Sequence, residues 1–128
     1  MTRHSHDRLS SIFELRKEFI SALKKEIPSA MPEEIDPTSK EGQKYLRDIV
    51  LYGVEEMFEA LQHLKNWKAH RKTDVGGDFN REDFLEEMVD AYNYFFSIMI
   101  HLDINEDEFY EAYCKKHGII KDRLKNGY

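Results

Sequence analysis

Apolar residues recur every three or four positions through most of the chain, and this spacing places them on one face of an α-helix. The first such stretch predicts a helix from about Arg8 to Glu26. Three prolines between positions 28 and 37 then impose an extended connection. The apolar face of this helix is predicted to consist of Ile12, Leu15, Phe19, Leu23 and Ile27.

A second helix is predicted from about Lys40 to about His70. Thr38 and Glu41 have the spacing of a capping box, in which the two side chains satisfy free backbone N–H groups at a helix start. Arg71–Phe79 contains two adjacent glycines and is predicted to be a flexible turn that can serve as a lid. The core stripe of the second helix is predicted to be Val50, Val54, Met57, Leu61 and Leu64.

Two further helices complete the pattern. Asn80 is predicted to cap a third helix that runs through position 102. Asn105 with Glu108 is predicted to start a fourth helix, which Gly118 ends, and a short basic helix at Lys121–Lys125 closes the chain. Because strand-like alternation is not sustained anywhere, the sequence predicts an all-α bundle of four to five helices.

Length and composition narrow the class of protein. At 128 residues, the chain is expected to form one domain, residues 1–128, with a flexible start at residues 1–7. The net charge of −6 argues against a general binder of nucleic acid or anionic membranes, and no apolar run approaches a membrane span. The single Cys114 cannot form an intrachain disulfide, so we expect a reducing, cytoplasmic setting.

Two carboxylate pairs stand out against this background: Glu56 with Glu59, and Glu87 with Asp90. Each pair is spaced i, i+3 within a predicted helix, so its two carboxylates face the same way. Hard divalent ions such as Mg²⁺ prefer oxygen ligands of this kind. Surface acids are usually only solvated. From residue 88 to 102, however, His101 is the only acidic or basic residue besides Asp90, and most of the others are apolar. We therefore expect Asp90 to be screened from open water and to need a cation.

The second helix is predicted to supply the other half of a metal site. Glu56 and Glu59 lie in a strip bordered by Ile49, Ala60 and Trp67, which suggests a half-buried cleft. Antiparallel packing through the turn between the two helices would bring the four carboxylates together. Four carboxylates can hold two or more Mg²⁺ ions, an arrangement suited to splitting phosphoanhydrides.

These motifs resemble the EExxE…ExxD signature of the all-α nucleoside triphosphate pyrophosphohydrolases, which include the MazG-like enzymes and the dimeric dUTPases. Glu55–Glu59 and Glu87–Asp90 carry the signature. Leu64–Lys68 resembles the FKxW segment of the dimeric dUTPases, and Phe84–Ser97 resembles their LLEEyvDxxHFxLS segment. Tyr113–Tyr128 is similar to their tail, YxKKxxxNxxRQxxGY.

The resemblance implies a MazG-like or dimeric dUTPase-like fold and hydrolysis of a deoxynucleoside triphosphate (dNTP) to a dNMP and pyrophosphate. It implies Mg²⁺ as cofactor, with Mn²⁺ as a substitute. The large apolar surface of the predicted helices suggests a homodimer or homotetramer in which a neighbouring subunit completes the site. dUTP is the first candidate substrate. Arg16 stands where dUTPases usually carry a base-reading Gln, and Ile120 and Leu124 depart from the tail pattern. A preference for dCTP or a purine dNTP therefore stays open.

The resemblance also implies roles for single residues. Glu56, Glu59, Glu87 and Asp90 would hold the metal, and Glu56 also counts among the catalytic groups. Glu55 or Glu86 would act as the catalytic base, although each is equally well explained as a solvated acid. The candidate substrate-binding residues are Arg16, Lys65, Trp67, Lys68, Asn93, Tyr113, Lys116 and Arg123.

Several of these roles have a structural alternative. Trp67 can stack on a base or pack at a helix edge, and Asn93 can bind the sugar or form an interhelical hydrogen bond. Tyr113 can donate to phosphate or lie in the core.

Two rival classes are weaker. A di-iron bundle oxidase needs Glu-x-x-His pairs, which the chain lacks. A non-enzymatic helical interaction module leaves Glu87 and Asp90 in an apolar helix unexplained.

Overall fold

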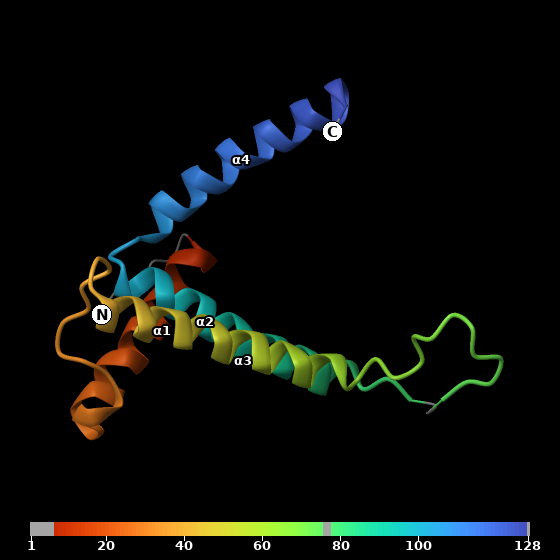
Figure 1. Ribbon diagram of the computed structural model, residues 1–128, viewed down its shortest axis with the longest axis horizontal. Coiled ribbons are helices and arrows are strands. Elements are labelled where there is room, and N and C mark those ends of the chain that lie inside the picture. Colours follow the sequence, from red (N-terminus) through yellow and green to blue (C-terminus); the bar gives the residue numbers. More distant parts are fainter. Residues whose placement is uncertain (1–6, 76–77, 128) are drawn as a thin grey trace. The chain divides into compact units, whose positions relative to one another are not determined.

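The computed structural model describes residues 7–75 and 78–127. Within these ranges the chain forms four α-helices, one short 3-10 helix and no strands (Figure 1), which confirms the all-α prediction. None of the described helices combines the length and apolar character that a membrane crossing needs. Of the predicted flexible start, residues 1–6 lie outside the described residues and only Asp7 is described. The two glycines of the predicted lid, at positions 76 and 77, also lie outside them. The elements are α1 (Arg8–Glu26), η1 (Pro28–Ala30), α2 (Lys40–Leu61), α3 (Arg81–His101) and α4 (Glu106–Asn126).

Side-chain caps start three of the helices near the predicted positions. Asp7 caps α1, and its Oδ1 accepts a hydrogen bond from the backbone N of Leu9 at 2.9 Å. Asn80 accepts from the backbone N of Asp83 at 3.0 Å, at the start of α3. Asn105 caps α4 and accepts from the backbone N of Glu108 at 2.8 Å. These acceptors satisfy N–H groups that lack a partner within the first helical turn.

α2 begins at Lys40 as predicted, but its capping residue differs from the prediction by one position. Ser39 is the N-cap, and its hydroxyl oxygen accepts from the backbone N of Gly42 at 2.9 Å. The predicted cap, Thr38, is engaged elsewhere: its hydroxyl donates to Oδ1 of Asp36 at 2.7 Å. Gly42 is required here, because a Cβ at this position would collide with the backbone carbonyl of Asp36. The capping box of Thr38 and Glu41 was therefore wrong.

The second helix is shorter than predicted, because α2 ends at Leu61 rather than near His70. The backbone N–H groups of residues 62, 63 and 64 donate to carbonyls three residues earlier, which tightens the last turn. Beyond it, the side chain of Asn66 bonds to Asp74 at 3.1 Å and to the backbone N of Val75 at 3.4 Å. An asparagine engaged in this way stabilises a loop instead of a helix.

The fourth helix is longer than predicted. It passes through Gly118 and includes Lys121–Lys125, so the expected fifth helix is its last turn. An isolated glycine costs a helix only about 1 kcal/mol relative to alanine, and Lys115, Lys116 and Lys121 nearby are good helix formers. Gly127, with φ of 90°, ends the helix instead.

The described residues fall into two compact units. The first contains α1, η1, α4 and the end of α3. Phe13 is fully buried in this unit, and its ring centroid lies 6.3 Å from that of Phe109 on α4. The predicted apolar face of α1 was wrong, because the buried residue lies one position after Ile12. The predicted face is largely exposed, at 42% for Ile12, 52% for Leu15, 48% for Phe19 and 51% for Ile27.

The second unit, residues 32–98, contains α2 and most of α3, which run antiparallel side by side (Figure 1). Tyr52 and Tyr94 face each other across the pair with ring centroids 5.7 Å apart. A Cβ on Gly53 would lie 2.7 Å from the ring of Phe95, so the backbone of α2 approaches α3 closely at this point. The buried face of α2 consists of Gly42, Leu46, Ile49, Gly53 and Ala60.

That face is not the predicted core stripe of α2. Val54 is 38% exposed and Leu61 is 53% exposed, whereas Ile49 and Ala60 are 5% and 1% exposed. The small residues explain the difference, since Gly53 and Ala60 let α3 approach where larger side chains would hold it off. Ile49 and Ala60, which sequence reasoning placed beside the carboxylates, therefore belong to the helix–helix contact face.

Candidate metal centre

Glu56 occupies a position in the contact face of α2. It follows Gly53 by three residues and precedes Ala60 by four, and both of these neighbours are buried. At 100° per residue, all three lie on one side of the helix. Glu56 is accordingly half-buried, whereas Glu55 and Glu59 on either side of it are exposed. A carboxylate thus stands where the rest of the face carries apolar or small residues.

Glu87 holds the corresponding position on α3. It is half-buried, four residues before the fully buried Ala91. Asp90 lies one turn along the same side, about 60° around the helix from Glu87. Carboxylate oxygens of Glu56, Glu87 and Asp90 all lie within 4.8 Å of one another. Two helices therefore bring together three of the four predicted metal ligands.

Asp90 is exposed, so the prediction that it is screened from water was wrong. The apolar residues on either side of it do not cover it, because two of them are themselves exposed. Val89 is 50% exposed and Tyr92 is 47% exposed. An apolar helix surface indicates burial only when a partner covers it. Asp90 thus forms the solvent-facing side of the cluster, and the two glutamates form its inner side.

Partial burial and the neighbouring carboxylates raise the pKa of both inner glutamates. The pKa of Glu87 is raised above its usual value, first by partial burial, then by repulsion from Glu59 and a side-chain hydrogen bond with it, and further by repulsion from Asp90 and Glu56. One oxygen of Glu87, Oε2, is buried and has no hydrogen-bond partner among the described residues. The contact with Glu59 requires a proton on one of the two carboxyl groups, so it gives Oε2 no partner when both groups are ionised. A buried acceptor of this kind favours a cation.

Glu56 shows the same effect. Partial burial raises its pKa most, followed by repulsion from Glu59, Asp90 and Glu55. Glu59 is not among the three residues whose oxygens converge, yet its charge reaches both inner glutamates. The fourth predicted ligand therefore lies at the edge of the cluster.

The spacing of the cluster fits a small divalent ion. Mg²⁺ binds oxygens at about 2.0–2.1 Å, so two ligands on opposite sides of one ion are about 4.1 Å apart. Oxygens already within 4.8 Å of one another need only small rotations to reach that geometry. A bound divalent cation would replace carboxylate repulsion with attraction and would provide Glu87 Oε2 with its missing partner.

Three predicted substrate residues lie away from the carboxylates of their own hairpin. Lys65, Trp67 and Lys68 follow the end of α2, so the predicted position of Trp67 on the carboxylate side of this helix was wrong. They line a cavity of about 710 Å³ whose helical wall is formed by Phe58 and Leu61. At 100° per residue, these two positions point about 160° and 140° away from Glu56.

The remaining predicted residues are spread over both units. Glu86 is exposed on α3, and Asn93 is half-buried on the same helix, where its backbone carbonyl accepts from the hydroxyl of Ser97 at 2.8 Å. Arg16 lies on α1, with its guanidinium carbon 4.6 Å from the ring centroid of Phe19. Three more are exposed on α4, namely Tyr113, Lys116 and Arg123.

Sequence reasoning missed several residues of the cavity. The available signal was a cluster of basic residues between two predicted helices, beside the single tryptophan of the chain. The unpredicted lining residues are Phe58, Leu61, Gln62, Leu64, Asn66 and Arg71.

Comparison with known proteins gives no match, whether to family models, to curated proteins or to solved structures.

Proposed function

We propose that the chain is a Mg²⁺-dependent nucleoside triphosphate pyrophosphohydrolase of the MazG-like and dimeric dUTPase type. It would cleave a dNTP, with dUTP the first candidate, to a dNMP and pyrophosphate. The observation that carries this proposal is the convergence of Glu56, Glu87 and Asp90 from two antiparallel helices. The orphaned oxygen of Glu87 and the raised pKa of both glutamates support a cation there.

The proposed reaction is the attack of water on the α-phosphorus. A bond forms between the water oxygen and this phosphorus, and the bridging bond to the β-phosphate breaks, so that pyrophosphate leaves. Bound Mg²⁺, for which Mn²⁺ can substitute, would supply Lewis-acid polarisation of the phosphate oxygens and a lower pKa for the attacking water.

The residues of the chain would hold the cation and take a proton from the attacking water. Glu56, Glu87 and Asp90 would hold the cation, and Glu59 could join them by turning in from the edge of the cluster. Glu55 and Glu86 are exposed, each next in sequence to one of the two inner glutamates, and are the candidates to accept the proton of the water.

The other proposed contacts with the substrate come from residues elsewhere in the chain. Lys116 and Arg123 on α4 would neutralise phosphate oxygens, and Arg16 would contribute to the choice of base. A dCTP or purine dNTP preference is compatible with the same metal chemistry. The proposed setting is the cytoplasm.

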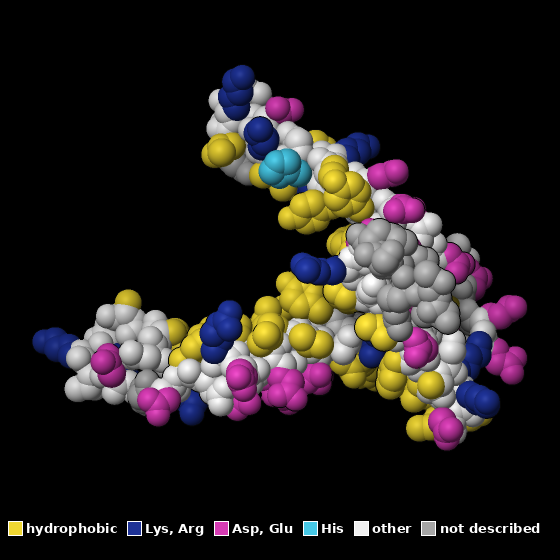
Figure 2. Space-filling model, turned by 180° about the vertical axis from the view of Figure 1, so that it is seen from behind, with side chains coloured by type: hydrophobic (Ala, Val, Ile, Leu, Met, Phe, Trp, Pro, Cys, Tyr) yellow, Lys and Arg dark blue, Asp and Glu magenta, His cyan; other side chains and the backbone are white. Residues whose placement is uncertain are grey.

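A homodimer or homotetramer is part of the proposal. In Figure 2 the α2–α3 hairpin shows acidic side chains along one edge and apolar side chains along the other. Large apolar residues on α2 are exposed, among them Leu51 at 51% and Phe58 at 59%. Exposed apolar surface of this kind favours a protein partner. The same surface is the one observation that favours a second candidate function, that of a helical interaction module without activity.

A pyrophosphate-release assay separates the two candidates. The chain is incubated with dUTP, dCTP, dATP, dGTP or dTTP, each with Mg²⁺, with Mn²⁺ and with EDTA. We expect release from at least one dNTP with either metal and none with EDTA. An absence of release from all five substrates with either metal would leave the interaction module as the better explanation.

A further inference from the structure

α4 carries an apolar stripe that the described residues of its own unit leave open. Every residue of this helix from Tyr110 to its end is exposed, with Tyr113 at 67% and Leu124 at 76%. The covered part is the start of the helix, where the ring of Phe109 packs against Phe13 on α1. Figure 2 shows apolar side chains gathered along α4. Apolar surface of this extent on one helix favours a protein partner.

The stripe follows a heptad repeat, in which steps of three and four residues alternate. At 100° per residue, the five side chains of the stripe lie within about 40° of its middle. Phe109 lies about 60° from the middle, so its contact with α1 leaves the stripe free. A repeat of this kind forms the seam along which two helices wind around each other in a coiled coil. The successive a and d positions are Tyr110, Tyr113, His117, Ile120 and Leu124.

Charge divides α4 into two halves. Positions 106–111 carry four acids and no Lys or Arg, whereas positions 115–125 carry five Lys or Arg residues and one acid. The helix dipole favours this order only within the first and last turns, and Lys115 and Lys116 lie in the middle of the helix. A second α4 laid antiparallel to the first would bring unlike halves together, whereas a parallel one would bring like halves together.

The seam and the charges agree on one antiparallel register. Each a position then faces a d position of the other helix, so Tyr110 meets Ile120 of a second copy. The same register places Asp107 beside Lys121 of the second copy, at e positions that flank the seam. On its own helix, neither residue has an opposite charge three or four positions away, and neither forms an ion pair with a described residue. Two-fold symmetry would give two such pairs in a dimer.

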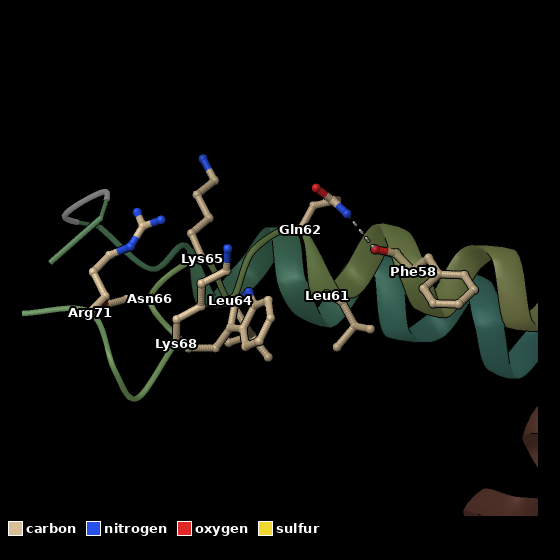
Figure 3. Close-up of a pocket in the computed structure, with 9 residues that line it drawn as sticks. Phe58, Leu61, Gln62, Leu64, Lys65, Asn66, Lys68 and Arg71 are labelled. Carbon is tan, nitrogen blue, oxygen red and sulfur yellow. Dashed lines mark hydrogen bonds between the residues drawn. The ribbon is translucent and has the colours of Figure 1, made fainter.

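The exposed apolar surface of α2 differs from this seam. At the end of α2, Phe58 and Leu61 line a cavity together with the loop that follows the helix (Figure 3). These two side chains are therefore shared with residues of their own unit. The stripe of α4 instead continues to Leu124, close to the end of its helix at Asn126.

We infer that α4 is a dimerisation element, which docks along its apolar stripe against the α4 of a second copy of the chain in an antiparallel coiled coil. The contact uses the same surface on both copies, so it closes on two chains. The inference does not rest on the proposed hydrolysis, and it assigns a contact separate from the apolar surface of α2. An anionic membrane is a poorer occupant, because it would repel the acidic half of the same helix.

Cys114 allows a direct test. It is exposed and is the only cysteine in the chain. It occupies the e position midway between Asp107 and Lys121, so the cysteines of two copies would lie next to each other at the two-fold axis. We expect a short bis-maleimide to join two native full-length chains into a covalent dimer. Cys114→Ser should abolish the cross-link and leave the dimer intact in sedimentation velocity.

Charge reversal tests the register. Asp107→Lys and Lys121→Asp each place like charges together twice in the dimer, and each should weaken dimerisation about tenfold at low ionic strength. The double variant should restore it. The two positions lie about 21 Å apart along one helix, so this rescue requires a second copy. Lys115→Asp is the matched control, because Lys115 lies on the side of α4 opposite the stripe and should be neutral.

Four outcomes would overturn the inference: a chain that stays monomeric, a dimer that does not cross-link at Cys114, a double variant that dimerises no better than the single ones, or a monomer that binds vesicles containing phosphatidylserine through α4. The proposed hydrolysis is judged separately by pyrophosphate release. A cross-linked dimer without release would retain this contact, and release by a chain that does not cross-link would retain the hydrolysis.

Discussion

Glu56 on α2 and Glu87 on α3 each place a carboxylate oxygen within 4.8 Å of the other, from half-buried positions on the facing sides of two antiparallel helices. Both pKa values are raised, and one oxygen of Glu87 is buried without a hydrogen-bond partner among the described residues. Two like charges in this position oppose the packing of the helices that carry them. The same two charges would favour that packing once a divalent cation lies between them.

Neutralising either inner glutamate should therefore stabilise the metal-free protein. Glu56→Gln and Glu87→Gln each keep the size of the side chain and remove one repelling charge. We expect each variant to melt at a higher temperature than the parent in EDTA, near neutral pH, by circular dichroism. Glu111→Gln, on an exposed position of α4, is the matched control and should leave the melting temperature unchanged. Lower melting temperatures for both inner variants would show that the carboxylates do not repel each other in the folded chain.

Metal removal should have the opposite effect on the parent. A ligand that binds only the folded state at about 100 times its Kd stabilises by about 2.7 kcal/mol. We expect Mg²⁺ at such an excess to raise the melting temperature above that in EDTA, and Asp90→Asn to lose most of this difference. Identical melting of the parent with saturating Mg²⁺ and with EDTA would argue against a metal at the cluster.

The pH dependence has a defined sign. The folded-state pKa values of Glu56 and Glu87 are raised above the usual 4.5, first by partial burial and then by neighbouring carboxylates. Between pH 4.5 and those raised values, the folded state binds more protons than the unfolded state. The stability of the metal-free protein should thus fall as pH rises through this window, while the affinity for Mg²⁺ increases.

Denaturant unfolding in EDTA at several pH values would measure this dependence. The difference between the parent and the Glu56→Gln, Glu87→Gln double variant isolates the contribution of the cluster. The pKa of Asp36 is lowered by its hydrogen bonds to Thr38, so its contribution is lost only below 3.8 and does not interfere. A difference that does not change between pH 4.5 and neutral pH would contradict the assignment.

Two glycine substitutions test the packing of α2 against α3. A Cβ at Gly53 would lie 2.7 Å from the Phe95 ring, so Gly53→Ala should destabilise by about 1–3 kcal/mol through overpacking. Gly118→Ala is the matched control, because no atom lies within 4 Å of its added Cβ. Since alanine favours a helix interior, the control should stabilise by about 0.5–1 kcal/mol. Stabilisation of both variants in urea unfolding would mean that α2 and α3 are not in close contact at Gly53.

The local rules of helix formation predicted most of the secondary structure. α1 has the predicted bounds, and Asn80 and Asn105 start α3 and α4 as predicted. The errors occur where one local signal competes with another. Ser39 replaces Thr38 as a cap because Thr38 is bonded to Asp36, and Asn66 engages loop partners beyond the early end of α2.

Helix faces were harder to predict than helix bounds. The pattern that placed Val54 and Leu61 in the core missed the close approach permitted by Gly53 and Ala60. The i, i+3 spacing nevertheless placed Glu87 and Asp90 together, and antiparallel packing brought Glu56 to them. The basic residues near Trp67 were a signal for the cavity, but its lining could not be predicted, because it depends on where α2 ends and on how the following loop folds back.

The most direct measurement is the rate of pyrophosphate release from dUTP and the other dNTPs by the parent and by Asp90→Asn, each with saturating Mg²⁺. A folded Asp90→Asn variant, with an unchanged helical circular dichroism spectrum, should be slower by about 100-fold or more because it lacks a metal ligand. Glu111→Gln should retain the parent rate. Hydrolysis by Asp90→Asn at the parent rate would contradict a catalytic metal held by Glu56, Glu87 and Asp90.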